Sequence, residues 1–454
     1  MPQNQAIYDA RQLGRAKMFI LGVQHMFAMF GATVLVPALT GLSVSATLLF
    51  AGLGTLLFHF ITKRKVPAFL GSSFAFIGGY QAIAPMLEDG SANTQMLPYA
   101  CLGVMLAGLM YVILSALFKV FGTKKVMRYF PPIVTGPVII CIGLTLSSTA
   151  ITNCRDNWAI ALIAIAIVVG CNIWGKGMVK IIPILLGVVG SYGVAVICQV
   201  TGMHTMDPAK LQALADAPWI GLPFQFEDTL FGLFSRPDLD TGLLLTAAVT
   251  IMPLSLATMV EHIGDMCAIS STCERNYLQD PGFHRTLLGD GLATSLASIF
   301  GAPANTTYGE NTGVLALSKV YDPRVIRIAA GLAILFSFSP KFAALVSAMP
   351  TATMGGVSMV LYGMISAVGV RNVVENQVDF TNSRNVIIAA LIMVLAIGIN
   401  YSGAVSFQVG EATISLSGLA VAAITGIVLN AILPGKDYEF GHDEKGDTAV
   451  NFKV

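Results

Sequence analysis

The sequence predicts an all-α polytopic membrane protein with fourteen transmembrane segments, arranged as two inverted seven-span repeats with short β-strands in spans 3 and 10. Three observations lead to this fold class: the composition, the distribution of Lys and Arg, and a similarity between the two halves. Of 454 residues, 55% are hydrophobic and only 11% are charged, and the mean hydropathy is +0.74. A soluble domain carries about 25% charged residues, so this chain has too few polar side chains to cover a globule in water.

The same composition excludes several classes of protein. A net charge of +1 gives no basic surface for nucleic acid. The seven cysteines are scattered without the spacing of a metal or redox site, so we expect them to pack as small apolar side chains. Residues 1–16 are polar and lead directly into a full-length apolar segment, so we expect no cleavable signal peptide.

A membrane-spanning helix needs about 20 apolar residues. Three of the expected spans, 71–87, 286–300 and 306–318, are short or interrupted by Pro and Gly, and the one long polar connection is 201–242. The fourteen expected spans are residues 17–39, 43–62, 71–87, 97–118, 129–148, 157–174, 179–200, 243–264, 286–300, 306–318, 325–345, 350–370, 384–400 and 412–433.

Lys and Arg indicate the orientation, because they concentrate in cytoplasmic loops. With the N-terminus in the cytoplasm and fourteen crossings, 22 of the 26 Lys and Arg residues fall on the cytoplasmic side. The four that fall outside are Arg155, Lys210, Arg236 and Lys341. This asymmetry favours a protein of the cell (inner) membrane with both termini in the cytoplasm.

The two halves of the chain share short motifs at nearly constant separation. Val23-Gln24-His25-Met26 resembles Val260-Glu261-His262-Ile263, and Ser72-Ser73-Phe74 resembles Thr306-Thr307-Tyr308, at offsets of 237 and 234 residues. The first motif lies in the first span of each half and the second in the third span. Because seven spans is an odd number, the second half enters the membrane from the opposite side. This inverted repeat is typical of secondary transporters, which bind substrate near the midplane at broken segments.

The broken segments around Phe74 and Tyr308 predict the binding site. Residues 303–313 combine Pro and Gly with extended-favouring Asn-Thr-Thr-Tyr and carry Glu310. Non-helical backbone survives at membrane depth only when it is buried in protein or lines a polar cavity. We expect the two segments to cross antiparallel, pair as short strands and lead into half-helices whose free N–H groups attract electronegative atoms.

Two carboxylates join those N–H groups, Glu310 in the half-helix and Glu261 in the first span of the same half. Ionisable residues inside a membrane are functional-site candidates, because an ionised side chain there costs about 3 kcal/mol. Acids and main-chain amides together suit a small planar ligand with N–H donors and C=O acceptors, such as the imide uracil. The same acids predict coupling to a proton, because desolvation favours the protonated form. Sodium remains open, since carboxylates also bind hard cations.

Two further acids lie in apolar surroundings. Asp265 is four residues after Glu261 and therefore on the same helical face, and Asp290 lies within span 9. Glu261, His262 and Asp265 resemble metal ligands, but no His or Cys on a third helix completes a site, so we expect neither a metal nor a cofactor. His25 is expected to organise the site, and His262 to support it, since it points about 100° away from Glu261.

These motifs resemble the nucleobase–cation symporter family, also called the nucleobase–ascorbate transporter group, and within it the bacterial uracil:proton symporters. The similarity covers nearly the whole membrane region. Its pieces are Gln24-His25, Gly71-Ser72-Ser73-Phe74-Ala75-Phe76, Glu261-His262-Ile263-Gly264 and Asn305 to Gly313, with Ser318-Lys319 after them.

The resemblance implies a homodimer in which each chain has a core domain from spans 1–4 and 8–11 and a gate domain from spans 5–7 and 12–14. It implies that uracil lies between the two strands, stacked on Phe74 and hydrogen-bonded by Glu261, Glu310 and Gly309, with Tyr308 close by. The corresponding division of the chain is 1–16 cytoplasmic N-terminus, 17–120 core, 121–200 gate, 201–242 extracytoplasmic loop, 243–345 core, 346–433 gate and 434–454 cytoplasmic tail.

Two positions depart from the uracil-type pattern. Asp265 stands where that pattern has His, and Asp290 resembles the acid of purine-transporting members. We expect Glu261 and Asp265 to share the proton, with Asp290 and His25 as further coupling residues. The alternatives are a xanthine, purine or urate carrier of the same family and, more distantly, an anion exchanger of the same architecture. The lack of mid-span Arg or Lys disfavours the exchanger, and the lack of catalytic motifs disfavours an enzyme.

Overall fold

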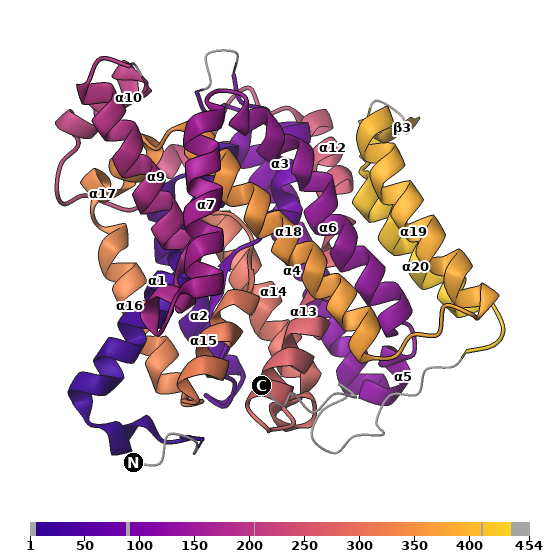
Figure 1. Cartoon of the computed structure of the whole chain (residues 1–454). Coiled ribbons are helices and arrows are strands. Elements are labelled where there is room, and N and C mark those ends of the chain that lie inside the picture. The colour runs from indigo at the N-terminus through magenta and orange to yellow at the C-terminus, as the bar shows by residue number, and fades with distance from the viewer. Residues whose placement is uncertain (1–5, 88–90, 204, 410–411, 437–454) are drawn as a thin grey trace.

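A computed structural model describes residues 6–87, 91–203, 205–409 and 412–436, with the main chain alone for residues 181, 310, 407, 409 and 412–415. The described part is mostly helical, and Figure 1 shows its helices running roughly parallel between an upper and a lower end of the molecule. The initial 3-10 turn η1 (Ala10–Leu13) and the short helix α5 (Thr123–Met127) lie at the lower end, and α10 (Pro208–Asp216) lies at the upper end.

The first half contains the following elements: α1 (Arg15–Thr40), α2 (Val44–Ile61), β1 (Leu70–Ser72), η2 (Phe74–Phe76), α3 (Ile77–Ile83), α4 (Leu97–Phe121), α5 (Thr123–Met127), α6 (Pro132–Cys154), α7 (Trp158–Trp174), α8 (Met178–Ile181) and α9 (Pro183–Val200). The connection that follows contains α10 (Pro208–Asp216), η3 (Phe226–Asp228) and α11 (Leu230–Phe234).

The second half contains α12 (Thr241–Ile251), α13 (Leu254–Thr272), η4 (Leu278–Gly282), α14 (Phe283–Ile299), β2 (Asn305–Thr307), α15 (Gly309–Ser318), α16 (Pro323–Ser337), α17 (Pro340–Ser347), α18 (Thr351–Glu375), α19 (Ser383–Ser402), β3 (Val405–Val409), β4 (Ala412–Leu416) and α20 (Gly418–Ile432). Each of the fourteen stretches expected to span the membrane contains helix, or strand followed by helix.

Several described helices have the length and composition of membrane spans. In the part of the chain that the structure describes, eight helices are long and apolar enough to cross a bilayer, counting α12 and α13 as one, and the bent pair α16–α17 makes up to nine. Shorter apolar helices occur at Phe74–Ile83, Trp158–Trp174 and Gly418–Ile432. The protein is therefore a multi-pass membrane protein.

The expected strands in spans 3 and 10 are confirmed. β1 and β2 pair antiparallel, with Leu70 opposite Thr307, Gly71 opposite Thr306 and Ser72 opposite Asn305. Main-chain hydrogen bonds extend the pairing at both ends, from Ser73 N–H to the Ala304 carbonyl and from Tyr308 N–H to the Phe69 carbonyl.

Side chains from neighbouring helices hold this crossing in place. The Leu70 N–H donates to Thr55 Oγ1 of α2 over 2.9 Å, and Thr294 of α14 donates to the Asn305 carbonyl over 2.6 Å. The Asn305 side chain donates to the Phe50 carbonyl. All three residues of each strand are buried. The extended backbone is therefore surrounded by protein and hydrogen-bonded, as non-helical chain at membrane depth must be.

The helices pack in two groups. In one group α14 lies against α2 and α4, and α16 against α1 and α2. In the other, α6 contacts α18, α19 and α20, and α7 contacts α9 and α18. Figure 1 shows α19 and α20 together along one edge of the molecule and α16 near the opposite edge. The strands β1 and β2 belong to the first group.

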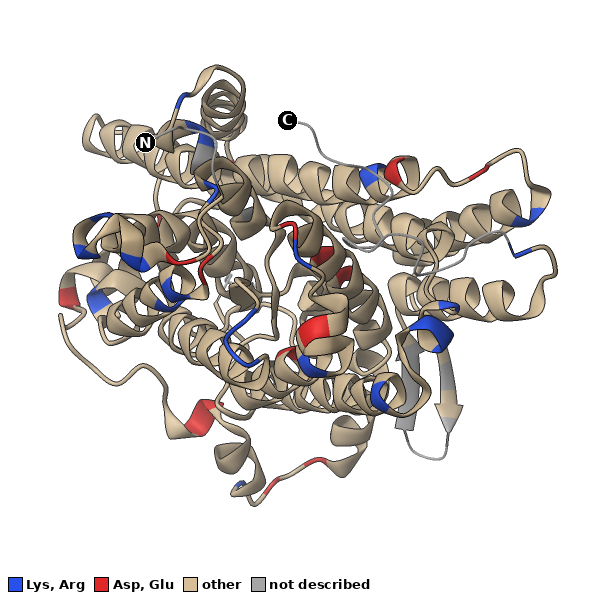
Figure 2. Cartoon of the chain, turned by 90° about the horizontal axis from the view of Figure 1, so that it is seen from below, with Lys and Arg blue, Asp and Glu red and all other residues tan. Residues whose placement is uncertain are grey.

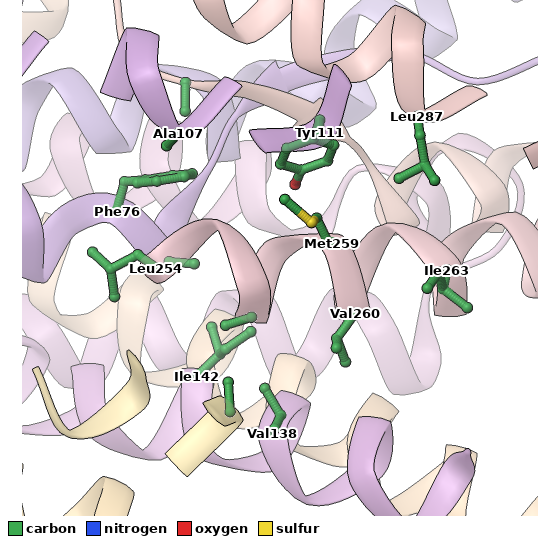
Figure 3. Close-up of a cluster of buried hydrophobic side chains, with 14 of the residues drawn as sticks. Phe76, Ala107, Tyr111, Val138, Ile142, Leu254, Met259, Val260, Ile263 and Leu287 are labelled. Atoms are coloured by element: carbon green, nitrogen blue, oxygen red, sulfur yellow. The ribbon is translucent and has the colours of Figure 1, made fainter. Parts of the chain in front are cut away.

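Helix α13 contacts both groups, as α1 also does through α9. It contacts α4 and α15 of the first group and α6 and α20 of the second. Figure 3 shows Met259 on one side of α13 near Tyr111, and Val260 on the other side near Val138. These side chains are buried, at 4% exposure or less for each. Glu261 and Asp265 thus lie on a helix that is packed between the two groups of helices.

Close helix contact within the first group depends on glycine. A Cβ on Gly108 of α4 would lie 2.6 Å from the carbonyl oxygen of Gly291, and a Cβ on Gly291 of α14 would lie 2.6 Å from that of Gly108. Small residues let helices approach closely in membranes, where packing contacts drive helix association.

The structure differs from the expected elements in three places. The span expected at 243–264 consists of α12 and α13, with a break at Met252-Pro253, and α13 continues to Thr272. The span expected at 325–345 is bent by 89° between α16 and α17, because Pro340 starts a new helix after Ser339. An unpredicted hairpin, β3–β4, lies between α19 and α20.

The N-terminal segment is fixed to the lower end of the first group. Ile7 pairs with Val320, the Tyr8 hydroxyl donates to the Cys273 carbonyl, and the Ala10 N–H donates to Asp322 Oδ2 over 2.8 Å. Asp9 lies 2.6 Å from Arg11 and 3.0 Å from Arg324, and the hydrogen bonds from Arg11 lower the pKa of Asp9 to about 2. Figure 2 views this lower face and shows Lys and Arg spread over it. We refer to residues 7–13 as the N-terminal latch.

Candidate functional site

The crossing of β1 and β2 brings together the two broken segments predicted to form the site. β1 leads through Ser73 into η2 and α3, and β2 leads through Tyr308 into α15. Phe74 and Gly309 therefore begin the two half-helices. Each helix start directs N–H groups toward the middle of the molecule, where they favour electronegative ligand atoms.

Gly71 and Tyr308 fit against each other at the crossing. A Cβ on Gly71 would lie 2.6 Å from the Tyr308 ring and 2.8 Å from Thr33 Oγ1. The Tyr308 hydroxyl donates to the Ser72 carbonyl over 2.7 Å and lies 3.4 Å from Thr33 Oγ1. The ring is 4% exposed and packs with α1. A direct contact between Tyr308 and a ligand remains a prediction.

Phe74 lies between the two groups of helices. Its ring meets that of Tyr362 on α18 edge-on, with centroids 5.7 Å apart, and it is 6% exposed. An aromatic side chain at this place can stack on a flat ligand. In this structure its aromatic partner comes from the opposite group of helices.

The side chain of Asp265, a residue of α13, lies close to the start of α15. A Cβ on Gly309 would lie 3.6 Å from Asp265 Oδ1, which is an ordinary van der Waals contact, so the carboxylate lies close to the first residue of α15. Thr307, the last residue of β2, donates its hydroxyl to Asp265 Oδ2 over 3.0 Å. Asp265 is partly buried. The structure thus places an acid from α13 beside the strand end and the helix start.

His262 and Asp290 form a pair behind β2. His262 Nδ1 lies 2.9 Å from Asp290 Oδ2, and neither side chain is exposed. His262 Nδ1 is also 3.4 Å from Thr307 Oγ1, and its Nε2 is 3.1 Å from Thr286 Oγ1. Isolated buried charges are costly, and His262 lies at ion-pair distance from Asp290. Neither carboxylate oxygen of Asp290 has a hydrogen-bond partner among the described residues.

His25 joins α1 to α15. The Asn311 amide donates to His25 Nδ1 and to the His25 carbonyl, each over 3.2 Å. His25 is 1% exposed, and its Nε2 has no partner among the described residues. Since Nδ1 accepts a hydrogen bond, a neutral His25 carries its proton on Nε2. His25 therefore orients the first turn of α15.

The structure describes Glu261 with its side chain and Glu310, the other predicted ligand carboxylate, by its main chain alone. Glu261 is a partly buried residue of α13, one helical turn from Asp265, and it takes part in a polar interaction. Glu310 is the second residue of α15, but its side chain lies outside the described residues. The main chain places it next to Gly309, at the helix start that faces Asp265.

The structure therefore brings Gly309, Asp265, Asp290 and the start of α15 together around the end of β2, and puts Phe74 at the end of β1. The sequence interpretation gave no role to Thr307 beyond the repeat and none to Asn311 or Tyr362. The available sequence signal for Thr307 was its place at the end of the Asn-Thr-Thr run, three residues before Glu310. No group of three or more His, Cys, Asp and Glu able to hold a metal occurs within the described ranges.

A separate cleft of about 290 Å³ opens at the upper end of the first group, and none of the predicted site residues lines it. Ser43, Thr94, Gln225 and Asp228 contribute its polar lining. Burial is the main cause that raises the pKa of Asp228, and the neighbouring Glu227 adds to it.

The chain matches known membrane proteins over most of its length. A sequence family described as "Permease family" matches residues 16–404. The uracil permease of Bacillus subtilis (strain 168) is 38% identical over 445 residues, which cover 95% of each chain. The uracil permease of Bacillus caldolyticus is 40% identical over 443 residues, 95% of this chain and 96% of that one. The uracil permease of Escherichia coli (strain K12) is 35% identical over 423 residues, covering 91% and 90%.

Among solved structures, the fold is similar to that of SLC26A9, with a TM-score of 0.65 and 14% identity over 94% of this chain and 66% of that one. The transmembrane domain of BicA, a cyanobacterium bicarbonate transporter, has a TM-score of 0.56 and 14% identity, covering 94% and 99%. At such low identity these structures show a shared fold alone.

Proposed function

The chain belongs to the permease family, and from this premise we propose that it imports a nucleobase, uracil first, by proton symport with alternating access. The observation that carries the substrate class is the similarity to proteins named uracil permease over 95% of both chains. The geometry that supports it is the crossing of β1 and β2, with two helix starts and the acids of α13 beside it.

The proposed ligand roles follow from chemistry at that crossing. Uracil lies between the strand ends, stacked on Phe74. Glu261 and Glu310 accept its N–H groups, and the N–H groups at Gly309 and after Phe74 donate to its carbonyl oxygens. Charged acceptors make strong hydrogen bonds in surroundings poor in water. Tyr308 contributes by holding β1 and β2 in register.

The proposed membrane arrangement has fourteen spans in two inverted repeats, with N- and C-termini in the cytoplasm of the cell that uses this inner-membrane protein. Spans 1–4 and 8–11 form the core domain, and spans 5–7 and 12–14 form the gate domain. The two packed helix groups support this division. Alternating access then consists of the core moving against the gate, and two gate domains associate in a homodimer.

Proton coupling rests on the buried acids. Glu261 and Asp265 take up the proton, Asp290 and His25 assist, and no cofactor takes part. Protonation removes the cost of carrying a bare carboxylate through the membrane interior. Sodium is the alternative coupling ion, since oxygen ligands also suit hard cations.

Two alternatives remain for the substrate. Asp290 resembles the acid of purine-transporting members, which favours a xanthine, purine or urate carrier of the same family. The fold shared with a bicarbonate transporter raises the more distant alternative of an anion exchanger. Acids around the strand crossing disfavour that alternative, because they repel an anion.

Competition during uptake tests the substrate. Uptake of labelled uracil into cells or proteoliposomes is measured with unlabelled xanthine, thymine and hypoxanthine in excess. Thymine is expected to compete partly and the two purines weakly. No uptake of labelled uracil, together with uptake of labelled xanthine, would assign the protein to the purine carriers.

A second experiment tests the coupling ion. Uracil accumulation should fall when the proton gradient is collapsed in medium free of sodium. Accumulation that persists without a proton gradient, or that requires sodium, would contradict proton symport.

A further inference from the structure

We propose that Asp265, Thr307 and His262 form a hydrogen-bonded proton relay that ends at Asp290, in which the His262–Asp290 ion pair stores the transported proton behind β2. The inference deepens the proposed function and rests on it. It gives Thr307 and His262 roles in proton transfer, and it makes Asp290 the end of a path that starts at the strand crossing.

The path is continuous in the structure. Asp265 Oδ2 accepts from Thr307 Oγ1 over 3.0 Å, Thr307 Oγ1 lies 3.4 Å from His262 Nδ1, and that nitrogen lies 2.9 Å from Asp290 Oδ2. Asp265 also faces the start of α15 at Gly309. One end of the path is therefore at the proposed uracil site, and the other end has no exposed surface.

Hydrogen-bond directions fix how many protons the pair can hold. The Thr286 hydroxyl donates to the Phe283 carbonyl over 3.1 Å, so it accepts from His262 Nε2. Because Nε2 then carries a hydrogen, the next proton that the pair takes up goes to His262 Nδ1, which lies at ion-pair distance from Asp290. With that proton the pair is neutral overall, and without it the pair has one negative charge.

The transfer step balances. The proton of a protonated Asp265 passes to Thr307 Oγ1 while the Thr307 hydroxyl proton passes to Nδ1 of a neutral His262 beside an ionised Asp290. One O–H bond breaks at Asp265, one forms and one breaks at Thr307, and one N–H bond forms at His262. Thr307 donating to Asp265, as observed, is the arrangement after this transfer.

Among the described side chains, groups from three helices face the relay, and the main chain places Glu310 at the start of α15 beside it. Glu261 lies one turn before Asp265 on α13, Asp290 is on α14, and Tyr111 of α4 meets His262 edge-on, with ring centroids 6.4 Å apart. None of these facing groups is Lys or Arg.

Transport by the full-length protein in proteoliposomes tests the link at Thr307. In Thr307→Val the hydroxyl is lost at nearly constant volume, and Thr307→Ser is the matched control that keeps it. We expect proton-driven uracil accumulation to fall at least about tenfold in Thr307→Val, with uracil exchange at equal pH on both sides preserved. Thr307→Ser should retain both activities.

Calorimetry in two buffers of different ionisation enthalpy tests the store, because it counts the protons taken up with uracil. Over a pH series, the wild type should take up about one proton per uracil in the range where affinity falls about tenfold per pH unit, and Asp290→Asn about none. Uptake of a full proton by Asp290→Asn would overturn the relay. Normal proton-driven uracil accumulation by Thr307→Val would also overturn it, and so would a loss of uracil exchange in that variant.

The failures are distinguishable. A wild type that binds no uracil overturns the proposed function together with the relay. A wild type that binds uracil without taking up a proton at any pH overturns proton symport and the relay. Coupled binding by the wild type, unchanged in both variants, overturns the relay alone.

Discussion

Single residues at the strand crossing divide between positioning the backbone and providing chemistry. Tyr308 belongs to the first kind, because its hydroxyl donates to the Ser72 carbonyl and its ring occupies the space that a side chain at Gly71 would need. Asp265 belongs to the second, because it faces the start of α15. Both kinds lie close together at the end of β2, so substitutions there should differ in effect.

Tyr308→Phe separates these two kinds of effect. Removing the hydroxyl breaks one buried hydrogen bond, and we expect a loss of about 1 kcal/mol in stability, seen as a lower melting temperature in detergent. The hydroxyl bonds to the Ser72 carbonyl and not to the ligand, so uracil affinity, measured by calorimetry, should change less than about threefold. A tenfold change would correspond to about 1.4 kcal/mol of binding free energy.

The contrary result for Tyr308→Phe would be a large loss of affinity with an unchanged melting temperature. It would place the Tyr308 hydroxyl on the ligand and assign the register of β1 and β2 to the remaining main-chain hydrogen bonds.

Much of the site could be predicted from residues alone, and some of it could not. Pro, Gly and the Asn-Thr-Thr run indicated a strand at 305–307, because such residues interrupt helices and favour extended backbone. The link from Asp265 through Thr307 to His262 was not predictable, since it joins residues about 40 positions apart and depends on how β2 lies against α13.

Whole elements were predictable where apolar length decided them. The breaks at Pro253 and Pro340 turned two expected single spans into bent or divided helices, since Pro removes a main-chain hydrogen bond and starts a new helix more readily than it continues one. The hairpin β3–β4 was missed although residues 405–408 alternate between apolar and polar, because the fourteenth span was expected to begin in it.

The contact between α4 and α14 yields a prediction for helix packing. In Gly108→Ala the new methyl would lie 2.3 Å from Ser295 Oγ and 2.6 Å from the Gly291 carbonyl oxygen, so the helices must separate. We expect a loss of about 1–3 kcal/mol, measured by thermal unfolding in detergent. Gly363→Ala on α18 is the matched control, since its methyl meets nothing within 4 Å.

An equal melting temperature for Gly108→Ala and Gly363→Ala would show that α4 and α14 do not approach each other as closely as in this structure.

The N-terminal latch yields a prediction about charge. Asp9 has a pKa of about 2 in the folded chain and 3.8 ordinarily, so its contribution is present above pH 4 and is lost as the pH falls toward 2. Asp9→Asn should lack this contribution at neutral pH. We expect faster hydrogen–deuterium exchange at the amides of Ile7 and Ala10 in the variant at pH 7.

If the amides of Ile7 and Ala10 exchange as fast in the wild type as in Asp9→Asn at pH 7, the Asp9 carboxylate does not hold the N-terminal latch. Asp216→Asn, in the exposed α10 at the other end of the molecule, provides a control for the loss of a single charge.

At the scale of the whole molecule, transport requires the two helix groups to move past each other. Gly264 of α13 and Asn372 of α18 lie across this boundary, since a Cβ on Gly264 would be 3.9 Å from Asn372 Nδ2. The double variant Gly264→Cys with Asn372→Cys should form a disulfide on oxidation. Uracil uptake should stop and should return after reduction.

Each single cysteine variant controls for that experiment, because the chain already contains seven free cysteines in its described part. Full uptake by the oxidised, cross-linked protein would contradict movement between the groups at α13.

The central claim is that acids of α13 and α15 bind uracil where β1 crosses β2, and direct binding to the purified protein tests it most closely. Calorimetric titration with uracil compares the wild type with Glu261→Gln and Glu310→Gln, and with Glu274→Gln as a control at an exposed residue just after α13. The account predicts that the wild type and Glu274→Gln bind alike and that the other two variants lose at least about tenfold in affinity. Undiminished binding by Glu261→Gln and Glu310→Gln would contradict it.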